Sequence, residues 1–206
     1  SNDRSLEPRL GFLIDLNNQQ KLSFGYGRHS KNEDLLTYFI QIEDEMGNTA
    51  YPNLDLKLTR ANHYIVGYEK MFGDDVQVKS EVYYQNINNL PVSDNPQKYW
   101  PPSFGDLYQD TLANIGESRN YGIELTVQKF FTNSYYLMFT SSVFDAKYKP
   151  ANGQWFNSKY NTNYASNLIG GKEIQWGNNK LIGLNAKAVW YGGKRLLPLD
   201  LDASID

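Results

Sequence analysis

Apolar and polar residues alternate with a period of two along most of this chain, the pattern of β-strands that have two different faces. Within residues 76–86, for example, Val82 and Tyr84 share one face, while Lys79 and Glu81 share the other. The alternation predicts about eight long strands, at residues 9–16, 21–28, 61–72, 76–86, 119–131, 135–148, 167–176 and 180–191. The strand at residues 135–148 is apolar on both faces in places, so its facing stays open.

The connections between these strands are alternately short and long. Short turns are expected at residues 17–19, 73–75, 132–134 and 177–179, and long loops at residues 29–59, 87–117 and 149–166. The first long loop contains a possible extra strand at residues 36–42. The second contains four prolines, which we expect to keep it out of a central strand: Pro91, Pro96, Pro101 and Pro102. An antiparallel meander with tight turns at one end and long loops at the other is typical of outer-membrane β-barrels.

The lengths and the ends of the predicted strands favour a membrane barrel. A tilted strand needs ~9–11 residues to cross a bilayer, whereas strands of soluble proteins are nearer ~5–6 residues. Aromatic residues gather at the predicted strand ends, as in the girdles of membrane barrels: Phe72, Phe130, Phe131, Tyr135, Tyr136 and Trp176 by the short turns, and Tyr148, Trp190 and Tyr191 by the long loops. The alternative is that these aromatic residues cap the core of a soluble β-sandwich.

The composition narrows the function classes. Aromatic residues make up 15% of the chain, and no apolar run approaches the ~20 residues of a membrane helix. The net charge of -3 and the lack of a basic stripe argue against a nucleic-acid partner. The chain has no cysteine, which excludes disulfides, thiolate metal sites and cysteine nucleophiles.

The first and last predicted strands place both termini at the long-loop end. Residues 1–4 are polar and charged, unlike a signal peptide. An exported barrel chain is expected to begin and end on the side of its short turns, so the chain is expected to be an internal slice of a longer precursor.

Several short stretches, in this order and spacing, resemble one family. They are residues 7–11 (EPRLG), 22–27 (LSFGYG), 58–64 (LTRANHY), 66–68 (VGY), 119–126 (RNYGIELT), 129–131 (KFF) and 170–173 (GGKE). Together they resemble the carboxy-terminal barrel region of a TonB-dependent outer-membrane receptor of the Bacteroidetes type. The tract at residues 119–124, with its N-x-G-x-E pattern, is the most specific part of the resemblance.

The resemblance implies a fold, a location and partners. The fold is all-β: an antiparallel up-and-down meander of about eight long strands that forms part of a large transmembrane β-barrel of ~22 strands. Residues 1–206 would be a partial barrel without its plug domain and closing strands. The parent receptor would lie in the cell outer membrane, bind a small-molecule, sugar or peptide nutrient, and import it to the periplasm with TonB. Its partners would be the plug domain, TonB through a segment absent here, the lipid bilayer and the nutrient.

Candidate ligand-binding residues fall into two groups. Exposed aromatic side chains of the long loops are suited to stacking on a ligand, and charged side chains of the barrel interior are suited to contacting a ligand or the plug. The candidates are Tyr99, Trp100, Trp155 and Tyr160 in the loops, and Arg119 and Glu124, with Lys79 and Glu81, on the lumen face. The alternative for the aromatic residues is that they pack the loops against one another.

No arrangement of residues indicates catalysis, a cofactor or a metal. His29 and His63 are far apart in sequence, and the acidic residues 43–45 are expected to form a solvated loop rather than a calcium site. Residues 166–173 lack the spacing of a phosphate-binding loop. An enzyme is therefore not expected. The second hypothesis is a soluble or surface-attached carbohydrate-binding β-sandwich that uses Trp100 and Trp155.

Overall fold

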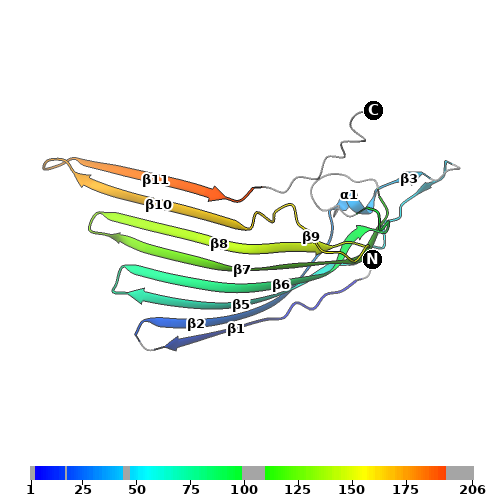
Figure 1. Ribbon diagram of the computed structural model, residues 1–206, viewed down its shortest axis with the longest axis horizontal. Coiled ribbons are helices and arrows are strands. Elements are labelled where there is room, and N and C mark those ends of the chain that lie inside the picture. Colours follow the sequence, from blue (N-terminus) through cyan, green and yellow to red (C-terminus); the bar gives the residue numbers. More distant parts are fainter. Residues whose placement is uncertain (1–2, 17, 44–46, 99–109, 194–206) are drawn as a thin grey trace.

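Eight long antiparallel strands form one continuous sheet, in which each strand pairs with its neighbour in the sequence (Figure 1). The computed structural model describes residues 3–16, 18–43, 47–98 and 110–193. The long strands are β1 (Arg9–Leu16), β2 (Gln20–Lys31), β5 (Thr59–Phe72), β6 (Val76–Ser93), β7 (Leu112–Thr132), β8 (Tyr135–Lys149), β10 (Tyr164–Gln175) and β11 (Leu181–Tyr191). The predicted all-β up-and-down meander is thereby confirmed.

Short turns lie at one end of the sheet and long connections at the other (Figure 1). The short turns contain left-handed residues, among them Asn18 (φ 65°), Gly73 (φ 63°), Asn133 (φ 53°) and Gly177 (φ 70°). Asn and Gly adopt this conformation at low cost, which is why these positions reverse the chain tightly. The long connections carry short elements, namely α1 (Leu35–Tyr38), β3 (Ile42–Glu43), β4 (Thr49–Ala50) and β9 (Phe156–Asn157).

The strand register sorts the side chains into an apolar face and a polar face. One row of register partners on the apolar face crosses six strands: Phe12, Phe24, Val66, Val82, Ile123 and Val143. These side chains are exposed, with 54% of Val82 and 57% of Val143 accessible to solvent. The same register settles the facing of β8, because Val143 and Phe139 lie opposite Ile123 and Val127. We call this side of the sheet the apolar face.

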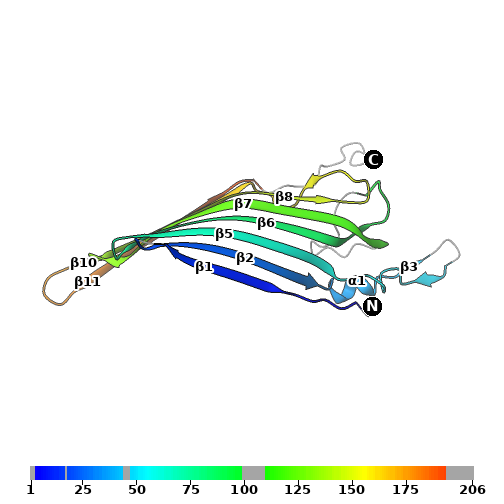
Figure 2. The ribbon, with the colours of Figure 1, turned by 90° about the horizontal axis from the view of Figure 1, so that it is seen from below.

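The described residues bury few hydrophobic side chains. Those that are buried are Ile40, Leu56, Val92, Leu112 and Tyr148. Within the described part of the chain, the only other sheet is the two-stranded β3–β4 pair, and Figure 2 shows the long strands as a single curved layer. A β-sandwich would bury its apolar face against a second large sheet. The described residues provide no such sheet for the soluble-sandwich alternative.

Strands β6 and β7 extend much further than the sequence pattern predicts. β6 continues to Ser93 and β7 begins at Leu112, so both run into the predicted loop at residues 87–117. Pro91 lies inside β6 and is fully buried, contrary to the expectation that it would stay out of a central strand. The β6–β7 register shifts on either side of Leu90, and such bulges accommodate a residue that cannot donate a ladder hydrogen bond.

The extra strand predicted at residues 36–42 is wrong. The segment forms the single-turn helix α1, with a hydrogen bond from Thr37 N–H to the Asp34 carbonyl (2.9 Å), and then enters the two-residue strand β3. A strand is stable only when a neighbouring edge pairs with it, and among the described residues only β4 pairs with this segment, through Ile42 and Glu43.

Within the described ranges, no helix is long and apolar enough to cross a membrane.

Asp75 links two neighbouring short turns. Its carboxylate accepts hydrogen bonds from Lys129 Nζ (2.9 Å) and Thr132 Oγ1 (2.6 Å), and its carbonyl accepts one from Phe130 N–H (2.8 Å). The Thr132 hydroxyl and then the Lys129 ammonium lower the pKa of Asp75 below its usual 3.8. The ionised carboxylate is therefore the form that the folded turn stabilises.

We predict that Asp75→Asn destabilises this turn pair only where Asp75 is ionised. Because the pKa of Asp75 is lower in the folded protein than the value near 3.8 in the unfolded chain, the ionised carboxylate stabilises the fold fully at pH values above 3.8. This stabilisation is lost as the pH falls through the lower pKa of the folded protein. Urea unfolding of the full-length protein in detergent should therefore separate Asp75→Asn from the wild type at pH 7 and bring them together in strong acid. An equal difference at both pH values would contradict this role.

Candidate functional site

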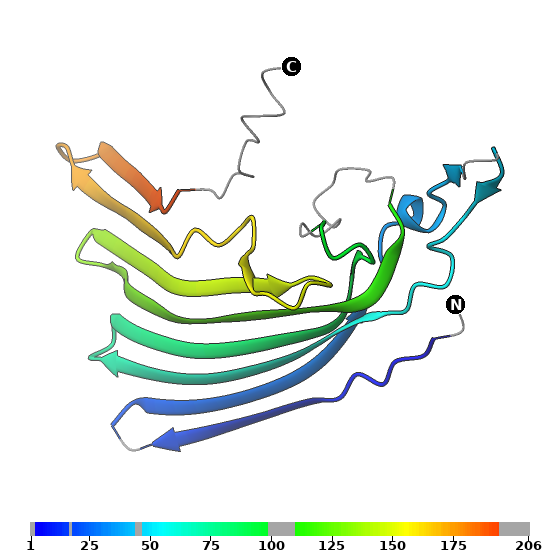
Figure 3. The same ribbon diagram turned by 45° about the vertical axis from the view of Figure 1, so that its right-hand side comes forward.

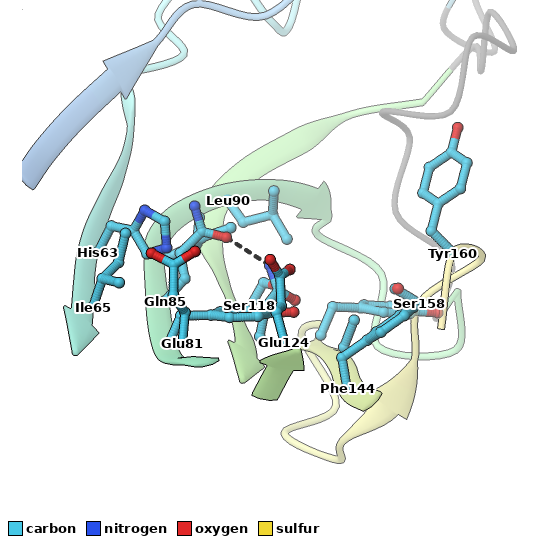
Figure 4. A pocket seen from close by; sticks show the side chains of 15 residues that line it. His63, Ile65, Glu81, Gln85, Leu90, Ser118, Glu124, Phe144, Ser158 and Tyr160 are labelled. Carbon is cyan, nitrogen blue, oxygen red and sulfur yellow. Dashed lines mark hydrogen bonds between the residues drawn. The ribbon is translucent and has the colours of Figure 1, made fainter. Parts of the chain in front are cut away.

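A hollow of about 530 Å³ lies on the polar face of the sheet (Figure 4). Alternate residues of four neighbouring strands line it, together with residues that follow β9. The lining includes His63 and Ile65 of β5, Glu81, Tyr83 and Gln85 of β6, Asn120 and Glu124 of β7, Phe144 of β8, and Ser158 and Tyr160. This hollow is the candidate site.

Two carboxylates face each other across neighbouring strands at the hollow. Glu81 and Glu124 are direct register partners, and both side chains lie on the polar face. Like charges placed directly opposite each other destabilise a sheet. Glu81 is neutralised by Lys79 at 2.9 Å, whereas Glu124 has no ion-pair partner within the described ranges. The site therefore carries an excess negative charge that would favour a cationic group.

The N-x-G-x-E tract in β7 has a specific structural role for each of its three named residues. Asn120 Nδ2 donates a hydrogen bond to Gln85 Oε1 at 2.7 Å, which holds the wall of the hollow (Figure 4). A Cβ atom on Gly122 would lie 2.9 Å from the Tyr83 hydroxyl and 2.8 Å from the Phe144 Cβ, so glycine makes room for Tyr83. Glu124 completes the carboxylate pair. The most specific motif of the sequence thus contributes two lining residues, Asn120 and Glu124, to the hollow.

The structure separates the six candidate ligand-binding residues into three groups. Glu124 and Tyr160 both line the hollow. Arg119 and Trp155 pack against each other elsewhere, with the guanidinium 4.2 Å from the centre of the indole ring. Tyr99 and Trp100 lie outside the described residues.

The expectation that Arg119 faces the lumen side with Glu124 is wrong. The β7–β8 register is regular from Glu117 to Lys129, so odd-numbered residues of β7 share one face. Arg119 therefore lies on the apolar face with Tyr121 and Ile123, and Glu124 lies on the other face. The alternation in the sequence already contained this answer, because Arg119 is two residues from Tyr121.

Sequence reasoning missed several residues of the hollow. Tyr83 and Gln85 continue the face of Glu81 along β6 and were predictable from the period of two. His63 lies opposite Gln85 in the register, and its ring meets the Tyr83 ring edge-on at 6.2 Å. That neighbour relation depends on strand pairing and has no local signal. Among the residues that the structure describes, no group of three or more His, Cys, Asp or Glu side chains is placed to hold a metal.

Comparisons with known proteins agree on one architecture. The family model described as "TonB dependent receptor-like, beta-barrel" matches residues 1–202. Similar solved structures include the ferric-catecholate import receptor Fiu of Escherichia coli K12 in its closed form, with a TM-score of 0.60 and 16% identity over 87% of this chain and 24% of that one. The alcaligin outer-membrane receptor FauA of Bordetella pertussis has a TM-score of 0.58 and 15% identity over 90% of this chain and 29% of that one.

The FrpB iron transporter of Neisseria meningitidis has a TM-score of 0.58 and 13% identity, over 89% of this chain and 26% of that one. The chain therefore spans about a quarter of the length of these three proteins, and at such identities the likeness shows the fold alone. The search of curated proteins finds no match.

We predict that Gly122→Ala destabilises the fold while Gly183→Ala does not. An added Cβ at position 122 would lie 2.7 Å from the Val143 carbonyl oxygen, and the cost of such overpacking is about 1–3 kcal/mol. A Cβ at position 183, in β11, would meet no atom within 4 Å. Urea unfolding of the full-length protein in detergent would measure both variants. Equal unfolding midpoints would show that the close approach at Gly122 is not required.

Proposed function

Because the chain belongs to the TonB-dependent receptor-like β-barrel family, we propose that it forms part of the wall of an outer-membrane receptor that imports a nutrient. The observation that carries the proposal is the two-faced sheet, with one exposed apolar face and one polar, hollowed face. A membrane barrel requires this division, because its outer surface contacts lipid while its interior contacts water, plug and ligand. The apolar face would lie against the lipid and the hollow would open to the barrel interior.

Aromatic residues at both ends of the strands support this placement in the cell outer membrane. Toward the long connections, Tyr64, Tyr84 and Tyr121 form a row of register partners on the apolar face. Toward the short turns, Phe72, Phe131 and Trp176 are exposed. Tyr and Trp concentrate at the two borders of a bilayer. The two groups would therefore mark the borders of the hydrocarbon layer.

The long connections would face the outside of the cell and the short turns the periplasm, as in bacterial outer-membrane barrels. Leu90 and Ser158 line the hollow at the end of the sheet where the long connections lie (Figure 3), so a nutrient entering from outside would reach this end first. Tyr160, which is 64% exposed at its rim, is suited to stacking on a ligand, and Glu124 is suited to binding a cationic group. Tyr99 and Trp100 remain proposed contacts from the same side of the barrel.

The carboxylate pair of Glu81 and Glu124 is proposed to contact the plug domain or the nutrient. Like charges placed directly opposite each other destabilise a sheet, and a basic group placed between the two strands would relieve that repulsion. The proposed parent receptor would obtain energy for import through TonB. Its cargo would be a nutrient of the small-molecule, sugar or peptide class, and the chain itself would carry out no chemical reaction.

We predict that Leu125→Lys prevents membrane assembly while Thr126→Lys is tolerated. Both residues lie in β7 midway between Tyr121 and Phe131, but Leu125 is on the apolar face and Thr126 is on the polar face. A lysine facing the centre of the bilayer costs about 2–4 kcal/mol. The assay is the amount of heat-modifiable, folded receptor in the outer-membrane fraction. Folded Leu125→Lys protein at wild-type levels would contradict the proposed facing.

We also predict that cells lacking the receptor and cells lacking TonB fail to remove the same compound from their medium. Mass spectrometry of spent medium, compared with that of the parent strain, would detect the remaining nutrient. Restoring the receptor should restore uptake, and restoring it with Glu124→Gln should restore less. Identical media from the parent and the receptor-lacking strain, across nutrient sources on which the receptor is expressed, would contradict an import function.

A further inference from the structure

Three cations gather on the apolar face at the long-connection end of β7 and β8. They are Arg119, Lys147 and Lys149, accompanied by Glu117 and Asp145. In the register, Glu117 lies opposite Lys149, Arg119 opposite Lys147, and Tyr121 opposite Asp145. We call these five charged residues the outer cationic cluster. The cluster follows directly after the tyrosine row that ends at Tyr121.

The charges of the cluster do not balance. Lys149 pairs with Glu117 at 2.6 Å and Lys147 pairs with Asp145 at 3.2 Å, while no acidic side chain in the described ranges pairs with Arg119. Asp145 is further occupied by hydrogen bonds from Tyr121 (2.9 Å) and Asn161 (2.8 Å). The net charge is therefore +1. Arg119 and Lys147 are also like charges placed directly opposite each other, which is unfavourable unless an anion lies between them.

Arg119 and its neighbour Asn86 each have a buried polar atom that makes no hydrogen bond, as expected at a ligand-binding site. The Nε atom of Arg119 is buried and makes no hydrogen bond, and the same is true of the Oδ1 atom of Asn86, its register partner on β6. The Trp155 ring lies against the guanidinium at 4.2 Å and within 5.5 Å of Lys149 Nζ. Stacking on an indole ring fixes the plane of an arginine while leaving its edge free to bind a planar or tetrahedral anion.

The position of the cluster identifies the anion. The cluster lies on the face proposed to contact lipid, so a nutrient in the barrel interior cannot reach it. It also lies beyond the tyrosine row, at the level where the headgroups of the outer leaflet begin. Arginine and lysine at this level attract anionic headgroups, and arginine binds phosphate through two parallel hydrogen bonds.

We propose that Arg119, with Lys147 and Lys149, binds the phosphorylated headgroup of an outer-leaflet lipid. Trp155 holds Arg119 in place, and Glu117 and Asp145 keep the two lysines extended beside it. The bound phosphate separates the opposed cations Arg119 and Lys147 and balances the charge of the cluster. The site rests on the proposed membrane placement, and it assigns to Arg119 and Trp155 a role other than binding the nutrient.

The test is native mass spectrometry of the full-length receptor, purified from the outer membrane in detergent and titrated with monophosphoryl lipid A. The double variant Arg119→Gln/Lys147→Gln should bind this lipid about 25-fold more weakly, at about fivefold for each cation removed. The matched control is Lys70→Gln. Lys70 is an outward-facing cation that lies 4.8 Å from the centre of the Phe72 ring, at the opposite border of the sheet, and its loss should leave the affinity unchanged.

Two further measurements separate the possible failures. Heat-modifiable mobility on gels shows that each variant is folded, and Arg119→Lys should bind more weakly than the wild type because it keeps the charge but loses the paired hydrogen bonds. Equal lipid affinity in the wild type and the folded double variant would overturn the lipid site while leaving membrane placement intact. Binding of inorganic phosphate at the cluster as tightly as the lipid would also overturn the lipid site. Absence of the receptor from the outer-membrane fraction would instead overturn the proposed function.

Discussion

Backbone hydrogen bonding between neighbouring strands is the interaction on which the rest of this structure depends. In hydrocarbon no water can pair with an exposed backbone group, so each crossing strand must be paired along its length. The long strands β5 to β8 meet this requirement with registers that run unbroken through the middle of the sheet. A regular register also fixes which side chains share a face, and a shift by one residue would exchange the positions on the apolar face with those on the polar face.

Because successive side chains of a strand point to opposite faces of the sheet, one strand contributes to both the apolar face and the polar face. Along β7, Glu124 reaches the polar hollow while Ile123 and Leu125, its direct neighbours, lie on the apolar face. Arg119 lies on the apolar face for the same reason, beside Trp155. The register also explains why residue 122 of the N-x-G-x-E tract is glycine, because Gly122 lies beside Tyr83 and Phe144 in the neighbouring strands. We therefore propose that β7 contacts both the ligand in the barrel interior and the lipid outside. Its even-numbered side chains would face the interior, and its odd-numbered side chains would face the lipid.

The sequence predicted well what depends on local pattern and poorly what depends on pairing. The strand at residues 9–16 and the turn at residues 73–75 follow from alternation and from Gly and Asp, and they agree with the structure. Arg119 was placed on the wrong face although the alternation contained the answer. Pro91 was excluded from β6 because a bulge has no clear signal in one sequence. The hollow itself was not predictable, since His63 and Asn120 meet Gln85 only after three strands pair.

The most direct test of the two-faced wall is spin labelling of single cysteines along residues 120–127 of β7, in the full-length receptor reconstituted in bilayers. This chain contains no cysteine of its own, so each label would report one position. The account predicts that labels at 121, 123, 125 and 127 collide with oxygen dissolved in the lipid, while those at 120, 124 and 126 collide with a water-soluble nickel complex. Accessibility without this alternation, or equal access of the nickel complex to all positions, would contradict it.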